Sequence, residues 1–473
     1  MSAGLTGVAD VVIPAHNEEA GMAACLLSLL AQRGAVDINV VVVANGCTDR
    51  TVEIAEGLRD AARAAGHRLS VLELEEAGKA RALNAADRLF RGDIHVYLDA
   101  DIVLSSGALA ALHRALADRP EPLMASPLPI PLLPAGHLAR GYAEVWMQLP
   151  SVASQVVGLG CYAVNRAGRE RWSEMPELVA DDAFVRARFS EHERRLLADE
   201  CFIYEFPSGR DLLGVLARWR EGNRELARLS TRDDPSVRLR GALATFAARP
   251  RLWRWLPSFA LVSAAVRLRR GRSETWFHAR RAAGGARAAP PRLWVGVAAR
   301  GLPVEERLLA SLEETLTGVE HTVALLEGSS TVPPRELDGR ELLLILEADA
   351  PLDTRGLELL LLVARRFPQA GVYAAGERPG TGARGVPAAW SGAAEPPSIR
   401  DARIASGSLL LIGPAAWAAL GERREAILLA HERPALLRLA RRRGFRPLQL
   451  PAGQPRRLGE QARSTPPSTH SSP

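Results

Sequence analysis

Lysine is almost absent from this sequence. The chain of 473 residues has 60 basic residues, and Lys79 is the one lysine among them. A GC-rich genome explains the general use of arginine. The lysine that remains is a candidate functional residue, because a compact ammonium group suits a phosphate or a carboxylate that lines a site. The alternative is an ordinary surface residue of a helix.

Cysteine is also scarce. The four cysteines lie far apart in the sequence and form no C-x-x-C pair; they are Cys25, Cys47, Cys161 and Cys201. This pattern argues against a disulfide framework and against a zinc cluster of the usual spacing. It is typical of proteins from a reducing compartment.

Long apolar runs are missing too. No stretch of 18 or more apolar residues occurs, so we expect no membrane-spanning helix. The first residues lack a basic region followed by an apolar one, so we expect no secretory signal. We therefore predict a cytoplasmic protein, or one attached to a membrane from the cytosolic side. The apolar fraction of 47% excludes a wholly disordered chain, and the length predicts two or three domains at about 150 residues each.

Strand-like apolar runs alternate with amphipathic helical stretches over the first 207 residues. The predicted strands are 8–13, 38–43, 69–74 and 94–98, and the predicted helices are 18–32, 51–65 and 79–89. Such alternation is typical of an α/β fold, in which helices cover a mostly parallel sheet. Ligands of these sheets bind beyond the carboxyl ends of the strands. The residues that directly follow each strand are therefore candidates for a site.

Polar or charged groups follow all four predicted strands. They lie at residues 14–19, 44–49, 78–81 and 99–101. Because the carboxyl ends of parallel strands meet at one edge, we expect these groups to line a single crevice. Their convergence is stronger support for a site than any one motif.

Asp99 and Asp101 are the most specific indication of a function among these groups. Residues i and i+2 at the end of a strand project to the same side, so both carboxylates can face one cation. Mg²⁺ and Mn²⁺ take one or two carboxylates and complete their shell with water and phosphate oxygens. A solvated turn is the alternative for an isolated D-x-D, but the position after a strand in this series favours a metal site.

Two further pairs stand later in the sequence. Gly158 and Gly160 permit close approach of the backbone. Asp181 and Asp182 precede a helical stretch, where adjacent carboxylates usually cap the helix. Within a crevice, one of these two aspartates could serve instead as a general base.

In this order, the segments resemble the family 2 glycosyltransferases with the GT-A fold. The family's first two nucleotide-binding loops resemble VVIPAHNEE at 11–19 and VVVANGCTDRT at 41–51. The segment that reaches the nucleotide sugar is similar to GKARALNAA at 78–86, and the metal-binding D-x-D is similar to DAD at 99–101. Two acids are usual where Ala44 and Asn45 stand, which leaves the nucleotide base open.

The acceptor side of the family is represented as well. Its acceptor loop resembles GLGCYAVNR at 158–166, its acidic pair resembles DD at 181–182, and the basic helix that often follows resembles RWREGNREL at 218–226. The resemblance extends over residues 1–226, slightly less than half of the chain. The acidic pair is Asp-Asp where Glu-Asp is commoner, and we favour Asp182 as the base.

The resemblance implies sugar transfer, with inversion, from a nucleoside diphosphate sugar to a hydroxyl acceptor. We favour a UDP-sugar as the donor, a saccharide or lipid-linked molecule as the acceptor, and a role in cell-envelope, polysaccharide or glycolipid synthesis. The lipid-linked or cell-envelope acceptor rests only on the basic aromatic segment at 208–292. The resemblance implies Mg²⁺ or Mn²⁺ on Asp99 and Asp101, and catalysis by Asp182 with Asp181 beside it. The residues implied for the nucleotide sugar are Pro14, Ala15, Asn17, Glu19, Asn45, Lys79 and Asp99. Those implied for the acceptor side are Gly158, Gly160, Trp219 and Arg220.

Positive charge is concentrated in the middle of the chain. Residues 208–292 hold 19 Arg and 6 Asp or Glu, a local net charge of +13, so the rest carries about −7. Apolar residues recur there at helical spacing, at Leu252, Trp255, Leu256, Phe259, Val262 and Val266. This run is too short to span a bilayer, but it suits a helix in the interface of an anionic membrane. A helix buried under the catalytic domain is the alternative. No nucleic acid is expected as a partner, because no known binding motif accompanies the charge.

The sequence predicts four regions. A GT-A domain at 1–210 is followed by a basic helical segment at 211–290, a second α/β domain at 291–455 and a disordered tail at 456–473. The second α/β pattern echoes the first, and it is either a degenerate, inactive copy or a chance similarity of Ala- and Leu-rich segments. In the copy, Glu347-Ala348-Asp349 would take the place of the D-x-D.

Two other hypotheses for the function are a nucleotidyltransferase and a non-catalytic protein. A nucleotidyltransferase of related architecture normally has a Gly-rich loop with a basic residue after its first strand, and residues 14–19 form no such loop. A non-catalytic nucleotide-sugar-binding or assembly protein is disfavoured by the intact Asp99, Asp101 and Asp182. The metal-dependent glycosyltransferase remains the leading hypothesis.

Overall fold

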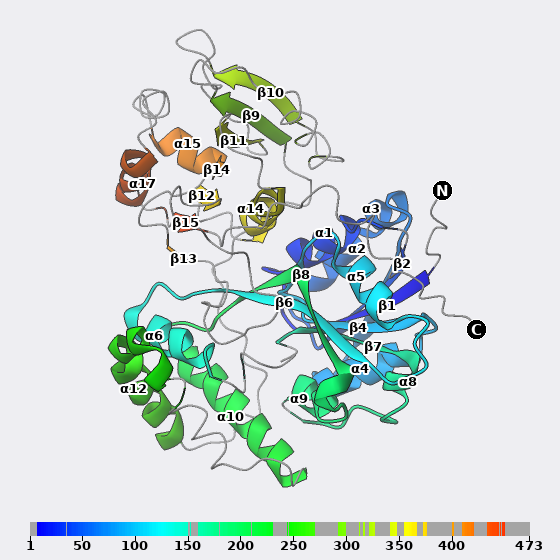
Figure 1. Ribbon diagram of the computed structural model, residues 1–473. Coiled ribbons are helices and arrows are strands. Elements are labelled where there is room, and N and C mark those ends of the chain that lie inside the picture. Colours follow the sequence, from blue (N-terminus) through cyan, green and yellow to red (C-terminus); the bar gives the residue numbers. More distant parts are fainter. Residues whose placement is uncertain are drawn as a thin grey trace, which may run out of the picture.

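The computed structural model contains two mixed β-sheets with helices packed against them (Figure 1). It describes residues 7–34, 36–149, 152, 159–178, 180–209, 211–229, 244 and 246–269. Beyond residue 291 it describes the strands and helices whose bounds are given below, with residues 312, 316, 413, 443, 445 and 447. The predicted tail at 456–473 and Gly158 lie outside the described residues.

The first sheet has eight strands in the order β3-β2-β1-β4-β7-β6-β8-β5. Their bounds are β1 Gly7–Ala15, β2 Val36–Asn45, β3 Arg68–Leu74, β4 Ile94–Leu98, β5 Val103–Leu104, β6 Met124–Leu132, β7 Cys161–Asn165 and β8 Arg194–Glu205. Strands β3, β2, β1 and β4 are parallel, which confirms the four predicted strands and their arrangement. Strand β7 runs antiparallel between β4 and β6.

Alternate residues of the parallel strands pack on opposite faces of this sheet, as the strand period of two requires. Val11 and Val40 join the cluster under α1 (Met22–Leu30) and α5 (Ala108–Leu116), whereas Val12 and Val41 join the cluster under α4 (Lys79–Asp87). Burial on both faces explains why β1 and β2 are predominantly apolar.

The predicted helix 51–65 is two helices, α2 (Thr51–Glu56) and α3 (Arg59–Ala64), which are separated at Gly57 and Leu58. The predicted helix 18–32 begins only at Met22, because residues 16–19 are bound to the loop after β2 as described below. Both differences leave the strand ends, and therefore the site, where they were predicted.

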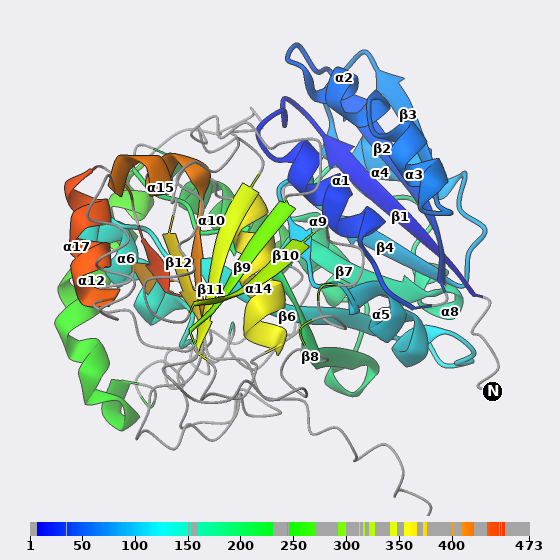
Figure 2. The ribbon, with the colours of Figure 1, turned by 90° about the horizontal axis from the view of Figure 1, so that it is seen from above.

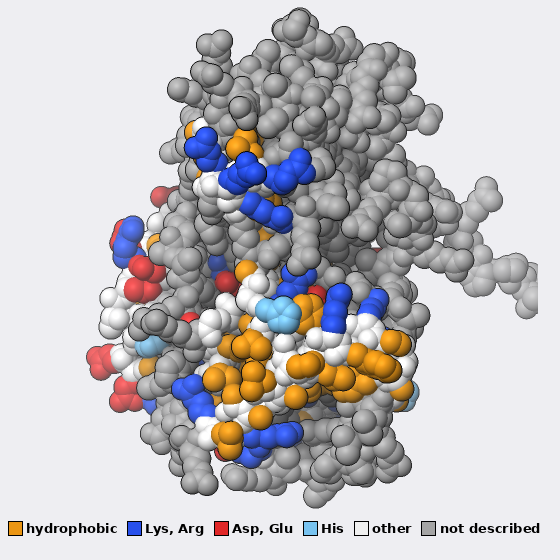
Figure 3. All heavy atoms as spheres, turned by 90° about the vertical axis from the view of Figure 1, so that its left-hand side faces the viewer, with side chains coloured by type: hydrophobic (Ala, Val, Ile, Leu, Met, Phe, Trp, Pro, Cys, Tyr) orange, Lys and Arg blue, Asp and Glu red, His pale blue; other side chains and the backbone are white. Residues whose placement is uncertain are grey.

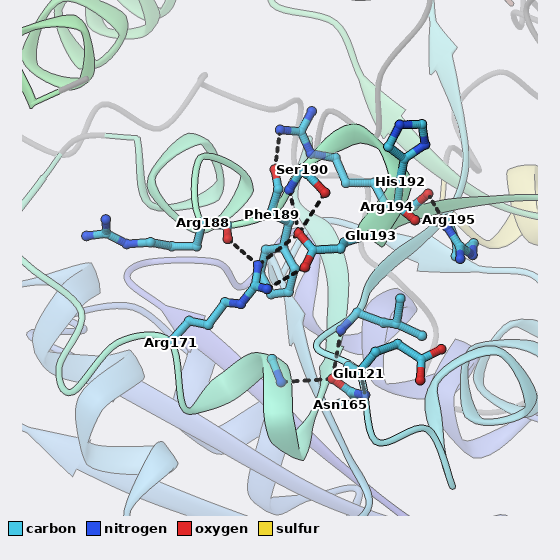
Figure 4. A network of polar contacts seen from close by, with 12 residues as sticks. Glu121, Asn165, Arg171, Arg188, Phe189, Ser190, His192, Glu193, Arg194 and Arg195 are labelled. Carbon is cyan, nitrogen blue, oxygen red and sulfur yellow. Dashed lines mark hydrogen bonds and ion pairs between the residues drawn. The ribbon is translucent and has the colours of Figure 1, made fainter. Parts of the chain in front are cut away.

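A polar network fixes the segment that leads from β7 to β8 (Figure 4). The Asn165 side chain accepts from the backbone N–H of Gly168 and of Leu123, each at 2.9 Å, and so caps α8 (Arg166–Arg169). Arg171 forms an ion pair with Glu193, the last residue of the short helix η1 (Glu191–Glu193). Helix α9 (Asp181–Arg186) lies between these two anchored ends.

Four helical segments form a third layer, at the lower left of Figure 1. They are α6 (His137–Trp146), α10 (Leu212–Leu229), η2 (Pro250–Trp255) and α12 (Leu256–Leu268). A Cβ on Gly141 of α6 would lie 2.6 Å from Ser258 Cβ, so this glycine lets α6 and α12 pack closely. Leu252, Val262 and Val266 are buried, so the buried-helix alternative is correct for these residues. Among the described helices, none is long and apolar enough to cross a membrane.

The second sheet has the order β10-β9-β11-β14-β12-β15-β13. Its elements are β9 Arg292–Ala298, β10 His321–Leu326, β11 Glu341–Glu347, β12 Val372–Ala375, β13 Arg400–Asp401, β14 Leu409–Ile412, β15 Leu448–Gln449, α14 Thr354–Arg366, α15 Pro414–Leu420 and α17 Arg433–Arg442. Its first six strands repeat the order and directions of β2-β1-β4-β7-β6-β8. The shared topology supports the predicted second copy, and Ala348 and Asp349 of its expected D-x-D lie outside the described residues.

The two sheets share one hydrophobic cluster. It contains Leu128, Ile130 and Ile203 of the first sheet together with Leu357 and Leu360 of α14. Helix α14 contacts α1 and β5. The predicted domain boundaries stay a prediction, but the second domain packs directly on the first.

Candidate active site

The loops after β1 and β2 are bound to each other. Asn45 is fully buried, and its amide donates to the Ala15 carbonyl at 2.7 Å and accepts from the Gly78 backbone N–H at 2.9 Å. It therefore connects the ends of β1 and β2 to the start of α4. The contact between Asn45 and the nucleotide stays a prediction; in the structure its side chain supports the loops through these bonds.

Asn17 and Glu19 also connect these loops. Asn17 has φ +57°, a left-handed conformation that asparagine tolerates, and its side chain accepts from the Thr48 backbone N–H at 2.7 Å. Glu19 is exposed, and its backbone N–H donates to the Asp49 carboxylate at 3.0 Å. Pro14 and Ala15 are buried at the end of β1, directly before these loop residues.

Lys79 joins the two acidic motifs of the site. Its Nζ lies 2.8 Å from Asp99 Oδ1 and 2.9 Å from Asp181 Oδ1. The Asp181 side chain is only 7% exposed, so the lysine neutralises a buried carboxylate. Burial opposes the charged form of Lys79, but the two carboxylates outweigh it and raise the pKa of Lys79 above its ordinary value. The ammonium therefore stays charged at every physiological pH.

Asp99 is held between this ammonium and a glycine. Its backbone N–H donates to the Gly160 carbonyl at 2.7 Å, and a Cβ on Gly160 would lie 3.0 Å from Asp99 Oδ2. Gly160 has φ +92°, so a side chain is disfavoured there for conformational reasons as well. The sequence predicted Gly160 on the acceptor side; the structure places it against the first aspartate of the D-x-D.

The D-x-D lies in a tight turn between β4 and β5. The Ile102 backbone N–H donates to the Asp99 carbonyl at 3.1 Å, and Gly21 at the start of α1 lies so close that its Cβ would be 3.1 Å from Asp101 Cα. Burial raises the pKa of the Asp99 carboxyl to about 6, against the opposing charge of Lys79. Within the part of the chain that the structure describes, no three His, Cys, Asp or Glu side chains are grouped to hold a metal. Two carboxylates fit a hard divalent cation that takes its other ligands from a diphosphate and water.

Asp181 and Asp182 occupy the first turn of α9 but have different surroundings. Asp181 is paired with Lys79, whereas Asp182 Oδ1 accepts from the Ala183 backbone N–H at 2.7 Å. Burial and the charge of Asp181 raise the pKa of the Asp182 carboxyl. A raised pKa makes a carboxylate a better proton acceptor near neutral pH.

Arg218 of α10 is a residue of this site that the sequence analysis did not single out. Burial lowers the pKa of its guanidinium, while the negative charges of Asp99, Asp101 and Asp181 act on this pKa with the opposite sign. The charges that act on Arg220 come instead from Arg224, Arg267 and Glu221. Residues two apart on a helix point about 200° apart, which explains the difference.

Trp219 belongs to a cluster of aromatic side chains. Its ring lies 5.3 Å from that of Trp146 and 5.9 Å from that of Phe206, measured between centroids. Gly222, one turn farther along α10, faces Ala180, where an added Cβ would lie 2.7 Å from the Ala180 Cβ. Helix α10 therefore packs against the residue that precedes Asp181.

Residues 10–126, from β1 to the start of β6, match the family model described as glycosyl transferase family 2. This match confirms the resemblance drawn from the sequence motifs. Together with the parallel strands of the first sheet, it confirms the predicted α/β fold class. Among curated proteins, none matches the chain.

Three solved structures are similar at low identity. The mannosyltransferase PcManGT of Pyrobaculum calidifontis, in complex with GDP-Man and Mn²⁺, is 20% identical, with 56% of this chain and 76% of that chain covered and a TM-score of 0.39. TarS residues 1–349 of S. aureus are 19% identical, with 51% and 71% covered and a TM-score of 0.35. The glucosyl-3-phosphoglycerate synthase of Mycobacterium tuberculosis, in complex with phosphoglyceric acid, is 20% identical, with 48% and 82% covered and a TM-score of 0.33.

Proposed function

We propose that this protein is a metal-assisted glycosyltransferase that transfers a sugar, with inversion, from a nucleoside diphosphate sugar to a hydroxyl acceptor. The observation that carries the proposal is the position of Lys79, which contacts both Asp99 of the D-x-D and Asp181 of the acidic pair. Lys79 therefore lies beside both the D-x-D, which would bind a metal and a diphosphate, and the acidic pair, which would accept a proton. The family match of residues 10–126 supports this reaction class.

On the donor side, Asp99 and Asp101 would hold Mg²⁺ or Mn²⁺, which when bound neutralises charge on the departing diphosphate. Arg218 would add positive charge near the diphosphate, since the charges of Asp99 and Asp101 act on its guanidinium. The loops after β1 and β2, with Asn17 and Glu19, would hold the nucleoside. Lys79 would keep the two acidic motifs at a fixed separation.

On the acceptor side, Asp182 would take the proton of the acceptor hydroxyl. The oxygen then forms a bond to the anomeric carbon from the face opposite to the diphosphate, and the bond from that carbon to the diphosphate oxygen breaks. The electron pair leaves with the diphosphate, so the configuration inverts. Asp182 suits this role better than Asp181, because Asp181 is engaged by Lys79 and Asp182 has the raised pKa.

We favour a UDP-sugar as the donor and an acceptor from cell-envelope, polysaccharide or glycolipid synthesis. The test is a panel of nucleotide sugars, with and without Mn²⁺, assayed for release of the nucleoside diphosphate. Release of one diphosphate that needs the metal and is lost in Asp101→Ala, but not in the exposed control Asp60→Ala, is the expected result. If no diphosphate is released and no nucleoside diphosphate changes the melting temperature, the protein is a non-catalytic member of its fold.

We also propose that the protein binds the surface of anionic membranes through η2 and α12. The exposed large apolar residues of this face are Leu138, Trp253, Leu261 and Leu268, with exposed fractions of 50, 58, 58 and 80%. Figure 3 shows hydrophobic side chains gathered on one side of the molecule, with basic side chains next to them. The arginines Arg251, Arg254, Arg267 and Arg269 are exposed, and residues 250–269 contain no acid.

An anionic bilayer is the partner that matches this combination of apolar and basic side chains. Flotation with vesicles that contain phosphatidylglycerol should recover the protein at low salt, and pure phosphatidylcholine vesicles should recover less. Trp253→Ser combined with Leu261→Ser should reduce recovery about tenfold, whereas Leu89→Ser, at an exposed apolar residue outside this face, should not. Absence of flotation at low salt would contradict the proposal.

A further inference from the structure

Helix α14 belongs to the second sheet in sequence but lies against the first domain (Figure 2). Its apolar residues Leu357, Leu360 and Leu361 join the cluster that contains β6 and β8. This packing brings its last residue, Arg366, next to the D-x-D turn. Arg366 is buried, with a side chain that is 5% exposed.

Two polar contacts of Arg366 lead to the first domain. Its Nε donates to the Asp101 carbonyl at 3.2 Å, and its Nη2 lies 4.0 Å from Glu205 Oε2 at the end of β8. A buried guanidinium is costly unless it is paired and hydrogen-bonded. Packing against the apolar cluster does not in itself require a charged side chain at this position.

The D-x-D turn has little freedom on its other sides. Gly160 lies against Asp99, and Gly21 lies against the backbone of Ala100 and Asp101. Arg366 contacts the same turn from the second domain, at the second aspartate. The orientation of the Asp101 carboxylate depends on its own backbone, and that backbone is what Arg366 holds.

We propose that Arg366 is a positioning residue that fixes the Asp99–Asp101 turn for binding of the metal and the diphosphate. On this proposal, which rests on the proposed function, the second domain is a required part of the donor site. Partners that orient a metal ligand typically change affinity or activity by about 10–100-fold when they are removed. We therefore expect Arg366→Met, which keeps most of the volume but cannot donate, to weaken Mn²⁺-dependent binding of the nucleoside diphosphate at least tenfold.

The first test measures this binding by calorimetry for the full-length chain. Arg366→Lys keeps one donor and should recover part of the affinity. Leu360→Ala is the control, because it loosens the same helix without touching Asp101, and it should lower the melting temperature while affinity stays within about twofold. Equal affinity of Arg366→Met and Leu360→Ala would overturn the role of Arg366.

The second test does not need a ligand. Hydrogen–deuterium exchange of the peptide that contains residues 99–104 should be at least tenfold faster in Arg366→Met than in Leu360→Ala. Equal exchange of this peptide in Arg366→Met and Leu360→Ala would overturn the proposal, even if the wild-type chain bound no diphosphate. If Arg366→Met does not fold, both measurements are made on Arg366→Lys. Failure of the wild type to bind any nucleoside diphosphate would contradict the proposed function instead.

Discussion

Lys79 Nζ lies 2.9 Å from the carboxylate of Asp181, a residue 102 positions later in the sequence. The same ammonium contacts Asp99, so one cation holds together two acidic motifs, one directly after β4 and the other in the first turn of α9. Arginine is the rule elsewhere in this chain. A lysine fits here because a compact ammonium can approach two carboxylates that a planar guanidinium would keep farther apart.

Removal of this cation should cost stability as well as activity. In Lys79→Met, the buried carboxylate of Asp181 loses its partner, and loss of one member of a buried pair typically costs about 3–5 kcal/mol. We expect a decrease of this order in the free energy of unfolding, measured by urea denaturation. Arg81→Met is the control, because Arg81 pairs with the exposed Glu177 and should change the stability little. Similar losses in both variants would contradict the role of Lys79.

Replacement of Asp182 should separate catalysis from stability. We expect Asp182→Asn to reduce kcat about 10²–10⁴-fold, the usual contribution of a general base. Because the pKa of Asp182 is raised in the folded protein, its ionisation opposes folding at neutral pH, so the variant should melt at a higher temperature. This gain should vanish near pH 4, where the unfolded state also binds the proton. In Asp181→Asn the melting temperature should fall instead, and the same direction in both variants would be evidence against this assignment.

The raised pKa of Asp182 also predicts the pH dependence of the rate. The base accepts a proton only when ionised, so kcat/KM should fall on the acid side at a pH above the ordinary range of a carboxyl. Wild-type enzyme assayed with saturating Mn²⁺ from pH 4 to 8 provides the measurement. A flat profile down to pH 4 would show that no group with a raised pKa takes the proton.

Much of the first domain could be predicted because its signals are local. The strands 8–13 and 38–43 are predominantly apolar, and the polar groups after them follow the rule for parallel sheets. The role of Asn45 could not be predicted, since its bonds to Ala15 and Gly78 depend on three segments that only the fold brings together.

Other features depend on the rotation of a helix or on contacts between distant residues. Arg218, and not Arg220, is affected by the charges of Asp99 and Asp101. This difference depends on how α10 is rotated in the fold, which cannot be read from a basic stretch of sequence. Helix α12 has apolar residues on its buried and exposed sides, so its pattern alone did not tell which side packs on α6. Arg366 and Asp101 are 265 residues apart, and no motif marks their contact.

Arg218 and Arg220 provide a direct test of the orientation of α10. Arg218→Met should reduce kcat/KM about 100-fold, the order of effect seen when one preorganised charge at a transition state is removed. Arg220→Met should retain activity within a few-fold, because its neighbours are Arg224, Arg267 and Glu221 rather than the cleft acids. Steady-state kinetics of the two variants, with circular dichroism as a check on folding, provide the comparison. A larger loss in Arg220→Met would return the predicted acceptor-side role to Arg220.

Gly160 should matter for binding and not only for backbone conformation. A Cβ at this position would lie 3.0 Å from Asp99 Oδ2, and φ is +92°, so Gly160→Ala combines backbone strain with displacement of a carboxylate. Gly209 is the matched control, because it also has positive φ, +57°, but an added Cβ would meet nothing within 4 Å. Strain of this kind costs about 1–3 kcal/mol, so both alanine variants should be less stable. Only Gly160→Ala should also weaken Mn²⁺-dependent binding of a nucleoside diphosphate, by about tenfold, as when a group that orients a metal ligand is removed. Equal binding by the two variants, measured by calorimetry, would mean that Gly160 serves the turn and not the position of Asp99.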